Sequence, residues 1–196
     1  MSDFNDLHSE VSGFAFPDYV SLLRAHSSGL IELGAAPDFA RQWLMADKSA
    51  PSFPRAIAHI QTLALLLFPV SWLVIAFVKS QLIWGAMAIL TLPMYAFLRP
   101  MTVNLIGGPL TLTIWFGYAC ILANLVGWFG DWSLAVGLTI IAPWLLNKFA
   151  YGLSRDTALS TALNSEAGFV KLFKAGVVSL KTSSGKYVSF RQKVSE

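Results

Sequence analysis

Metal-ligating side chains are few in this sequence and lie far apart along it. The three histidines, His8, His26 and His59, fall in different segments, and none has a second His, Cys or carboxylate at the spacing of a metal site. A metal centre needs several such ligands converging on one ion. The sequence therefore predicts no metal and no cofactor, and we interpret His59 as a solvated histidine at a membrane surface.

Candidate nucleophiles and phosphate-binding turns lack the neighbours that would activate them. Ser71 and Ser133 lie in apolar stretches without an adjacent base, and no serine sits in a GxSxG motif. The turn at Gly107-Gly108-Pro109 has neither the strand nor the lysine of a phosphate loop. Cys120 is the only cysteine, so no intrachain disulfide can form. These features predict a protein that is not an enzyme.

Most of the sequence between Ala56 and Asn147 consists of long apolar runs. The chain is 55% hydrophobic and 13% charged, and only Lys79, Arg99 and Asp131 are charged between Ala56 and Asn147. A charge at the bilayer centre costs about 2.5 to 3.5 kcal/mol, so charges confined to the breaks indicate runs that cross lipid. We expect an all-α polytopic membrane protein in which region 55–148 is a four-helix transmembrane bundle. Its spans are predicted at about 57–78, 82–98, 110–129 and 131–147.

The fourth run is the weakest of these spans. At a rise of 1.5 Å per residue, Trp132 to Leu146 reaches roughly 23 Å, which is short of the about 30 Å hydrocarbon core, so a re-entrant hairpin is the alternative. With four crossings, most basic residues near the span ends fall on one side, and only Lys79 falls on the other. The majority are Arg41, Lys48, Arg55, Arg99, Lys148 and Arg155. This asymmetry predicts a multi-pass protein of a cell membrane, of the bacterial inner-membrane kind, with both termini in the cytoplasm.

Small residues recur every four positions in the third run and predict a helix-packing face. The face comprises Ala119, Ala123 and Gly127, with Asn124 beside it to hydrogen-bond to another helix. Tryptophans near the run ends are interpreted as interfacial anchors. These are Trp43, Trp84, Trp128 and Trp132. Pro69, Pro93 and Pro143 predict kinks within three of the runs.

Residues 1–54 form an acidic N-terminal region with seven acids and three bases. Residues 1–16 are polar and without periodicity, so we expect them to be mobile, and residues 17–33 are expected to form a broken helix interrupted at Ser27-Ser28-Gly29. An amphipathic helix is predicted near 37–48, with Phe39, Trp43 and Leu44 on its apolar face. Such a helix lies in the membrane interface or docks onto a partner subunit.

Region 149–196 is the basic C-terminal region, and from Lys148 onward the chain has eight bases and three acids. Ser154 is expected to cap a helix, and a second apolar stripe is centred on Phe169 and Phe173. Residues 177–181 and 186–190 alternate as strands and predict a β-hairpin with Gly185 in its turn. A lone hairpin is marginally stable in water, so it should pack on the adjacent helices or extend a partner's sheet.

The two ends of the chain are therefore the expected recognition surfaces. The partner-binding candidates are Phe39, Trp43, Leu44, Phe169, Phe173, Gly185, Val188 and Phe190. Other membrane-protein subunits are the expected partners, and resting on anionic lipid is the alternative for the basic C-terminal region. The bases are too dispersed to predict nucleic-acid binding.

The expected function is that of a non-enzymatic multi-pass membrane protein that acts by protein–protein contact. It would serve as a small subunit of a secretion or transfer apparatus, or as an immunity or exclusion protein. The alternative is an oligomeric channel or small-solute transporter, for which the three prolines and Asn124 are the support.

Overall fold

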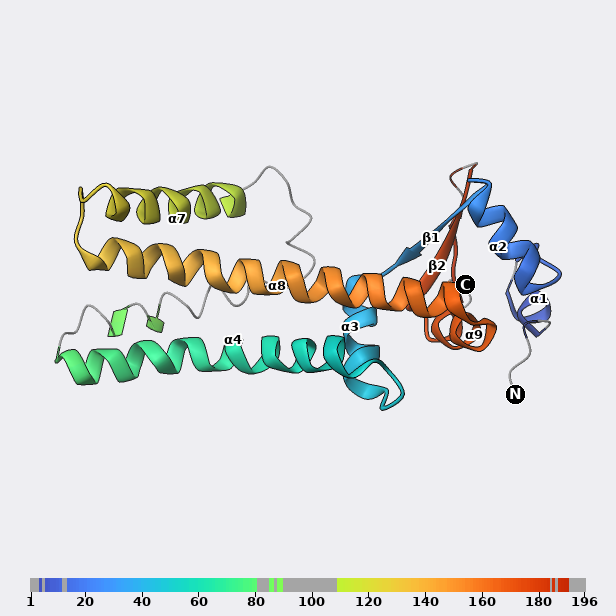
Figure 1. Ribbon diagram of the computed structural model, residues 1–196, viewed down its shortest axis with the longest axis horizontal. Coiled ribbons are helices and arrows are strands. Elements are labelled where there is room, and N and C mark those ends of the chain that lie inside the picture. Colours follow the sequence, from blue (N-terminus) through green and yellow to red (C-terminus); the bar gives the residue numbers. More distant parts are fainter. Residues whose placement is uncertain are drawn as a thin grey trace. The chain divides into compact units, whose positions relative to one another are not determined.

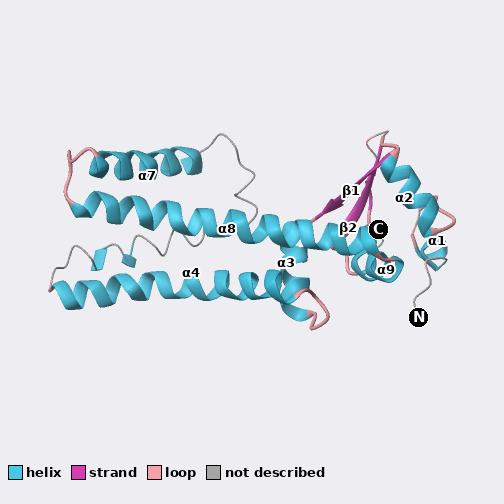
Figure 2. Cartoon of the chain, in the orientation of Figure 1, coloured by secondary structure: helices cyan, strands magenta, loops and turns pink. Residues whose placement is uncertain are grey.

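The computed structural model divides the chain into two compact units. The first, which we call the composite domain, combines Met1–Arg55 with Tyr151–Glu196, and the second, the helical unit, comprises Ala56–Ala150. The structure describes residues 4, 6–11, 14–80, 85–86, 88–89, 109–183, 185 and 187–190. Figure 1 follows the chain through both units, and all the strands drawn in Figure 2 belong to the composite domain. The chain thus leaves the composite domain, forms the helical unit and returns.

The N-terminal part of the composite domain contributes helices α1 (Asp6–Glu10), α2 (Tyr19–Ser27) and α3 (Pro37–Ala46) and strand β1 (Ile31–Ala35). A capping box starts α2, in which the Asp18 carboxylate accepts from the Ser21 amide at 2.6 Å. Gly29, with φ +74°, then turns the chain into β1. The helix expected over 17–33 is therefore wrong in its last part, whereas α3 begins at Pro37 as predicted.

The C-terminal part contributes helix α9 (Glu166–Lys174) and strands β2 (Val178–Thr182) and β3 (Tyr187–Val188). The predicted hairpin is confirmed, because β2 and β3 pair antiparallel and Gly185 has φ +80°. β1 pairs antiparallel with the other edge of β2, so that Leu33 lies opposite Leu180. In Figure 1 the blue β1 accordingly lies beside the red β2. One three-stranded sheet, in the order β1-β2-β3, joins the two ends of the chain.

Aromatic residues from both ends of the chain form the core of the composite domain. The Phe4 and Phe169 ring centroids lie 5.8 Å apart, and those of Phe14 and Phe173 lie 5.6 Å apart. Phe4, Phe14 and Leu7 are all buried. The expectation that residues 1–16 are mobile is therefore wrong for the described part of this segment. Its isolated aromatic side chains have no periodicity of their own, but they cover the apolar stripe of α9.

Among its described residues, the helical unit contains three long helices, parts of which extend beyond it: α4 (Ser52–Lys79), α7 (Pro109–Leu125) and α8 (Asp131–Asn164). The axis of α4 bends by 47° between Ser52–Ala64 and Pro69–Lys79, where Pro69 predicted a kink. α8 continues without a break past Pro143. The fourth predicted run and the helix expected after Ser154 are thus one helix, in which Ser154 is buried at an interior position and does not mark a helix start.

The predicted four-helix transmembrane bundle is wrong. By length and composition, one described helix segment, Trp132–Asn164, is able to cross a membrane, and the bent α4 supplies a second if its two halves count as one span. The apolar part of α7, Ile114–Leu125, is too short to qualify. The predicted span 82–98 falls almost entirely outside the described residues. Counting apolar runs fails here because a run does not show where its helix ends.

Candidate functional site

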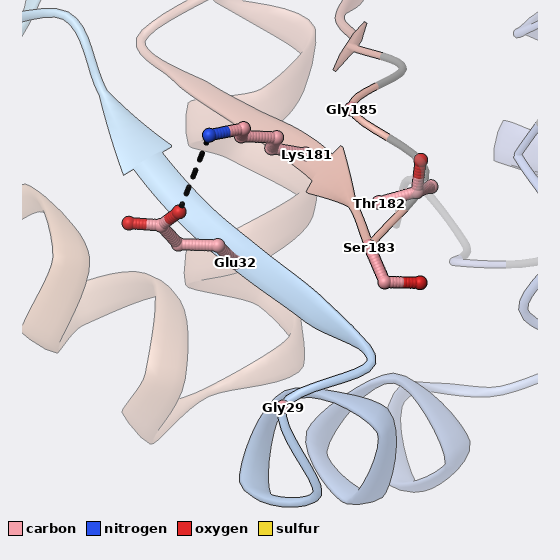
Figure 3. A pocket seen from close by; sticks show the side chains of 6 residues that line it. All are labelled: Gly29, Glu32, Lys181, Thr182, Ser183 and Gly185. Carbon is pink, nitrogen blue, oxygen red and sulfur yellow. Dashed lines mark ion pairs between the residues drawn. The ribbon is translucent and has the colours of Figure 1, made fainter.

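A shallow polar cavity of about 440 Å³ opens in the composite domain, where β1 begins and β2 ends. Its lining residues are Gly29, Glu32, Lys181, Thr182, Ser183 and Gly185. Figure 3 shows Glu32 on β1 and Lys181 on β2 reaching toward each other, with the side chains of Thr182 and Ser183 where β2 ends. The Ser183 amide donates to the Leu30 carbonyl at 3.0 Å, which closes this end of the sheet. The sheet pairing itself therefore positions the cavity.

The charges in this cavity are compensated and solvated. The Lys181 ammonium lies 3.9 Å from a Glu32 carboxylate oxygen, and both side chains are exposed. The same ammonium lies 5.8 Å from the centroid of the Tyr187 ring. An exposed ion pair contributes at most about 1 kcal/mol to stability, so it is available to exchange partners. An exposed and compensated ion pair suits a polar contact surface better than a buried catalytic site.

A second polar cluster lies between α3 and α9 of the composite domain, around a cavity of about 270 Å³. Asp47 is its centre, with a carboxylate oxygen 2.5 Å from the Lys171 ammonium. The Trp43 indole donates to this carboxylate at 2.9 Å, and the Ser49 hydroxyl and amide donate at 2.8 and 3.0 Å. The cluster ties the residues that lead into α4 to helix α9.

These partners determine the charge state of Asp47. The Lys171 ammonium and then the two Ser49 donors hold the pKa of the Asp47 carboxyl well below its usual range, and the Trp43 indole adds to the effect. Hydrogen bonds and a cation both favour the ionised carboxylate, which is why they act in the same direction. The cluster is therefore a permanently charged structural contact and not a proton donor or acceptor near neutral pH.

Replacing Asp47 with asparagine is expected to weaken the composite domain and change its acid response. Because the carboxyl pKa is lower in the folded state than in the unfolded state, the contact stabilises the fold above about pH 4 and is lost as the pH falls. Lys171 is half-exposed, so we expect a loss of about 1 kcal/mol at pH 7 in Asp47→Asn. Urea unfolding of the full chain at several pH values measures this. Parallel pH profiles in the two proteins would contradict the assignment.

Most of the predicted partner-binding residues lie in the core of the composite domain. Leu44, Phe169, Phe173 and Val188 are buried, and Phe39, Trp43 and Phe190 pack against the core while partly exposed. Gly185 forms the hairpin turn beside the polar cavity. Phe39 and Trp43 of one stripe and Phe169 and Phe173 of the other therefore belong to or pack against one core that both ends of the chain build.

The predicted helix-packing residues are displaced from the actual helix contact. Ala119 is exposed, Ala123 is half-buried, and Gly127 lies beyond the end of α7 in a turn with φ +73°. The Asn124 amide donates to the Gly130 carbonyl at 3.3 Å and to the Phe129 carbonyl at 3.5 Å. Asn124 therefore closes the turn after its own helix and does not bond across to another one.

The tight contact between α7 and α8 is instead made by Gly117 and Gly137. A Cβ atom added at Gly137 would lie 2.8 Å from the Gly117 carbonyl oxygen and 2.5 Å from Cγ1 of Ile121. A Cβ atom at Gly117 would lie 2.9 Å from Cγ2 of Ile140. One glycine on each helix thus permits close backbone approach. The prediction considered only small residues that repeat within one run, so it missed a contact to which each helix contributes a single glycine.

The predicted interfacial tryptophans have different surroundings. Trp128 is 79% exposed and Trp132 is 44% exposed at the turn between α7 and α8, which is consistent with anchors. Trp43 belongs to the Asp47 cluster, and Trp84 lies outside the described residues.

No protein-family model, curated protein or solved structure matches this chain. Among the described residues, no three His, Cys, Asp or Glu side chains group in a way that could hold a metal ion.

A buried polar pair in the helical unit was missed by sequence reasoning. The Gln61 amide on α4 donates to the Asn147 side-chain oxygen on α8, and both side chains are buried. The pair joins the outer ends of the first and last predicted spans, which are 86 residues apart. Two amides at the ends of separate apolar runs are a signal that could have suggested the contact.

Proposed function

We propose that this chain is a non-enzymatic membrane protein that acts by protein–protein contact. In this proposal α4 and α8 of the helical unit cross the bilayer. The composite domain lies in the cytoplasm and binds another membrane-protein subunit.

The exposed apolar surface of the helical unit supports membrane association. Of the 25 large hydrophobic side chains that are exposed among the described residues, 21 belong to the helical unit. On α4 they recur at three- and four-residue spacing along one face, namely at Leu63, Leu67, Val70, Val74 and Phe77. Monomeric soluble proteins rarely expose a continuous apolar stripe of this length. Lipid is the solvent that suits it.

The pairing of β1 with β2 supports an even number of crossings. β1 precedes the helical unit and β2 follows it, yet the two strands form one sheet in one compact domain. In this proposal both flanks of the helical unit lie on the same side of the membrane. The basic residues near the two ends of the helical unit favour the cytoplasmic side, and these are Arg41, Lys48, Arg55, Lys148 and Arg155.

The sheet of the composite domain supports contact with a protein partner. β1 is an edge strand, and no described strand pairs with its outer side. An edge strand offers backbone donors and acceptors to an added strand of a partner. The Glu32–Lys181 pair in the cavity of Figure 3 lies at the start of this edge and adds a polar pattern that a partner can recognise.

Membrane integration is tested by alkaline carbonate extraction of membranes that contain the full chain. We expect the protein to stay in the pellet, because two apolar helices resist the conditions that strip peripheral proteins. A protein that is fully released into the supernatant would contradict the membrane role.

Partner contact is tested by affinity capture from mild detergent. We expect other subunits to be captured in a fixed ratio. The double variant Glu32→Lys with Lys181→Glu keeps the ion pair but reverses its charges, so it should fold and lose the partner. The matched swap of Glu10 and Lys174, which are paired at 2.8 Å elsewhere in the domain, should retain it. Elution as a homo-oligomer alone would instead favour the channel or transporter.

A further inference from the structure

Two groups of three basic residues in the described chain differ in their partners. Lys171, Lys174 and Lys181 each form an ion pair with a carboxylate, at 2.5, 2.8 and 3.9 Å. In contrast, no described carboxylate lies within 4.0 Å of Arg55, Lys148 or Arg155. The cations of the second group all lie close in sequence to the two ends of the apolar helical segments.

Neutral groups hold two of these cations in place. The Arg55 guanidinium, in the first turn of α4, donates to the Lys48 carbonyl at 2.9 Å. The Lys148 ammonium lies 5.2 Å from the centroid of the Trp144 ring on α8. A carbonyl or an aromatic ring orients a cation without cancelling its charge. The charge of each therefore remains available to an external anion.

The spacing of Lys148 and Arg155 along α8 places both cations on one face of the helix, near the end of its apolar run. Lys148 and Arg155 are seven residues apart in one unbroken helix, which corresponds to about two turns, and both are exposed. Tyr151, between the two cations, and Trp144, one turn before Lys148, lie on the same face, at the end of the apolar run. Amphipathic rings combined with long basic side chains at the end of an apolar helix suit the level of lipid headgroups.

The acidic residues near this face do not cancel its charge. Asp38 hydrogen-bonds to Tyr151 and interacts with Arg41, whose guanidinium carbon lies 5.7 Å from the centroid of the Tyr151 ring. Asp156 follows Arg155 but points about 100° away around the helix.

We propose that Lys148 and Arg155, two turns apart on the continuous helix α8, bind the headgroups of anionic phospholipids. This inference rests on the proposed membrane function and adds the class of lipid that the protein selects. The continuity of the basic face with an exposed apolar helix favours a lipid over a soluble anion. A phospholipid can pair its headgroup with the cations while its acyl chains contact the apolar side chains. Charge complementarity at the cytoplasmic leaflet, where anionic lipids gather, points to the same ligand.

The test measures lipid selectivity in vesicles of phosphatidylcholine mixed with phosphatidylglycerol. The full chain is reconstituted and extracted gently, and the lipids that it retains are counted by native mass spectrometry. We expect the wild-type protein to retain phosphatidylglycerol in preference to phosphatidylcholine. The double variant Lys148→Gln with Arg155→Gln should lower this preference by about fivefold for each cation removed.

The control variant removes the same net charge far from the proposed face. Arg24→Gln with Lys174→Gln should keep the preference, since Arg24 lies on α2 and Lys174 is already paired with Glu10. Equal retention of phosphatidylglycerol in both double variants, in protein that is integrated in the vesicles, would overturn this inference alone. Failure of the wild-type protein to integrate would overturn the membrane function and this inference with it.

Discussion

Replacing Phe169 with alanine is expected to destabilise the composite domain by about 3 to 5 kcal/mol. The Phe169 ring is fully buried and lies within 6.4 Å, centroid to centroid, of the rings of Phe4, Phe14, Tyr19 and Phe173. Three of these neighbours come from the first 19 residues of the chain. Truncating Phe169 therefore leaves a cavity in the core and also releases the N-terminal segment.

Pulse proteolysis of the full chain in urea measures this loss. Trypsin cleavage at Arg24, in α2, reports opening of the composite domain, and the substitution does not change any trypsin site. Tyr187→Ala is the matched control, because this ring on β3 is 55% exposed and its loss should cost under about 1 kcal/mol. Equal urea midpoints for the two variants would show that the N-terminal aromatic residues do not depend on α9.

Local sequence signals predicted the parts of the fold that short stretches determine. Pro37 marked the start of α3 because its fixed φ suits the first turn of a helix. Gly185 marked the hairpin turn because it adopts a positive φ, and the alternation on either side produced β2 and β3. Each of these features depends on a few adjacent residues.

Contacts between distant segments could not be predicted in this way. β1 was missed because Ile31–Ala35 becomes a strand only by pairing with residues about 150 positions later. Phe4 and Phe14 were assigned to a mobile tail because their partners, Phe169 and Phe173, lie at the other end of the sequence. Burial of Phe169 and Phe173 within the chain could not be predicted for the same reason, since an apolar stripe does not identify what covers it.

The helix lengths were misjudged because the hydropathy of a run does not show where its helix begins or ends. Gly127, with its positive φ, follows the end of α7 and leaves that helix too short to count as a span. The fourth run was considered the weakest, yet it continues into the composite domain as the longest described helix. What sequence reasoning identified correctly was the apolar character of these segments.

Alanine at Gly137 is expected to lower the stability of the helical unit by about 1 to 3 kcal/mol. Its new methyl group would meet the Gly117 carbonyl oxygen at 2.8 Å, so α7 and α8 would have to move apart. The strain outweighs the gain of about 1 kcal/mol that alanine brings over glycine in a helix. The temperature at which half of the detergent-solubilised protein leaves the monodisperse chromatographic peak measures the effect.

Gly152→Ala is the matched control, because Gly152 lies in the same helix and a methyl group there meets no atom within 4 Å. Only the helix-propensity term remains at this position, so Gly152→Ala should raise stability by about 0.5 to 1 kcal/mol. The two alanine variants should therefore shift the transition in opposite directions.

Adding Ile121→Ala to Gly137→Ala removes a side-chain clash but leaves the backbone clash with Gly117, so the double variant should remain less stable than the wild type. Full recovery in that double variant would place the constraint in the Ile121 side chain and would contradict a backbone contact between the two helices.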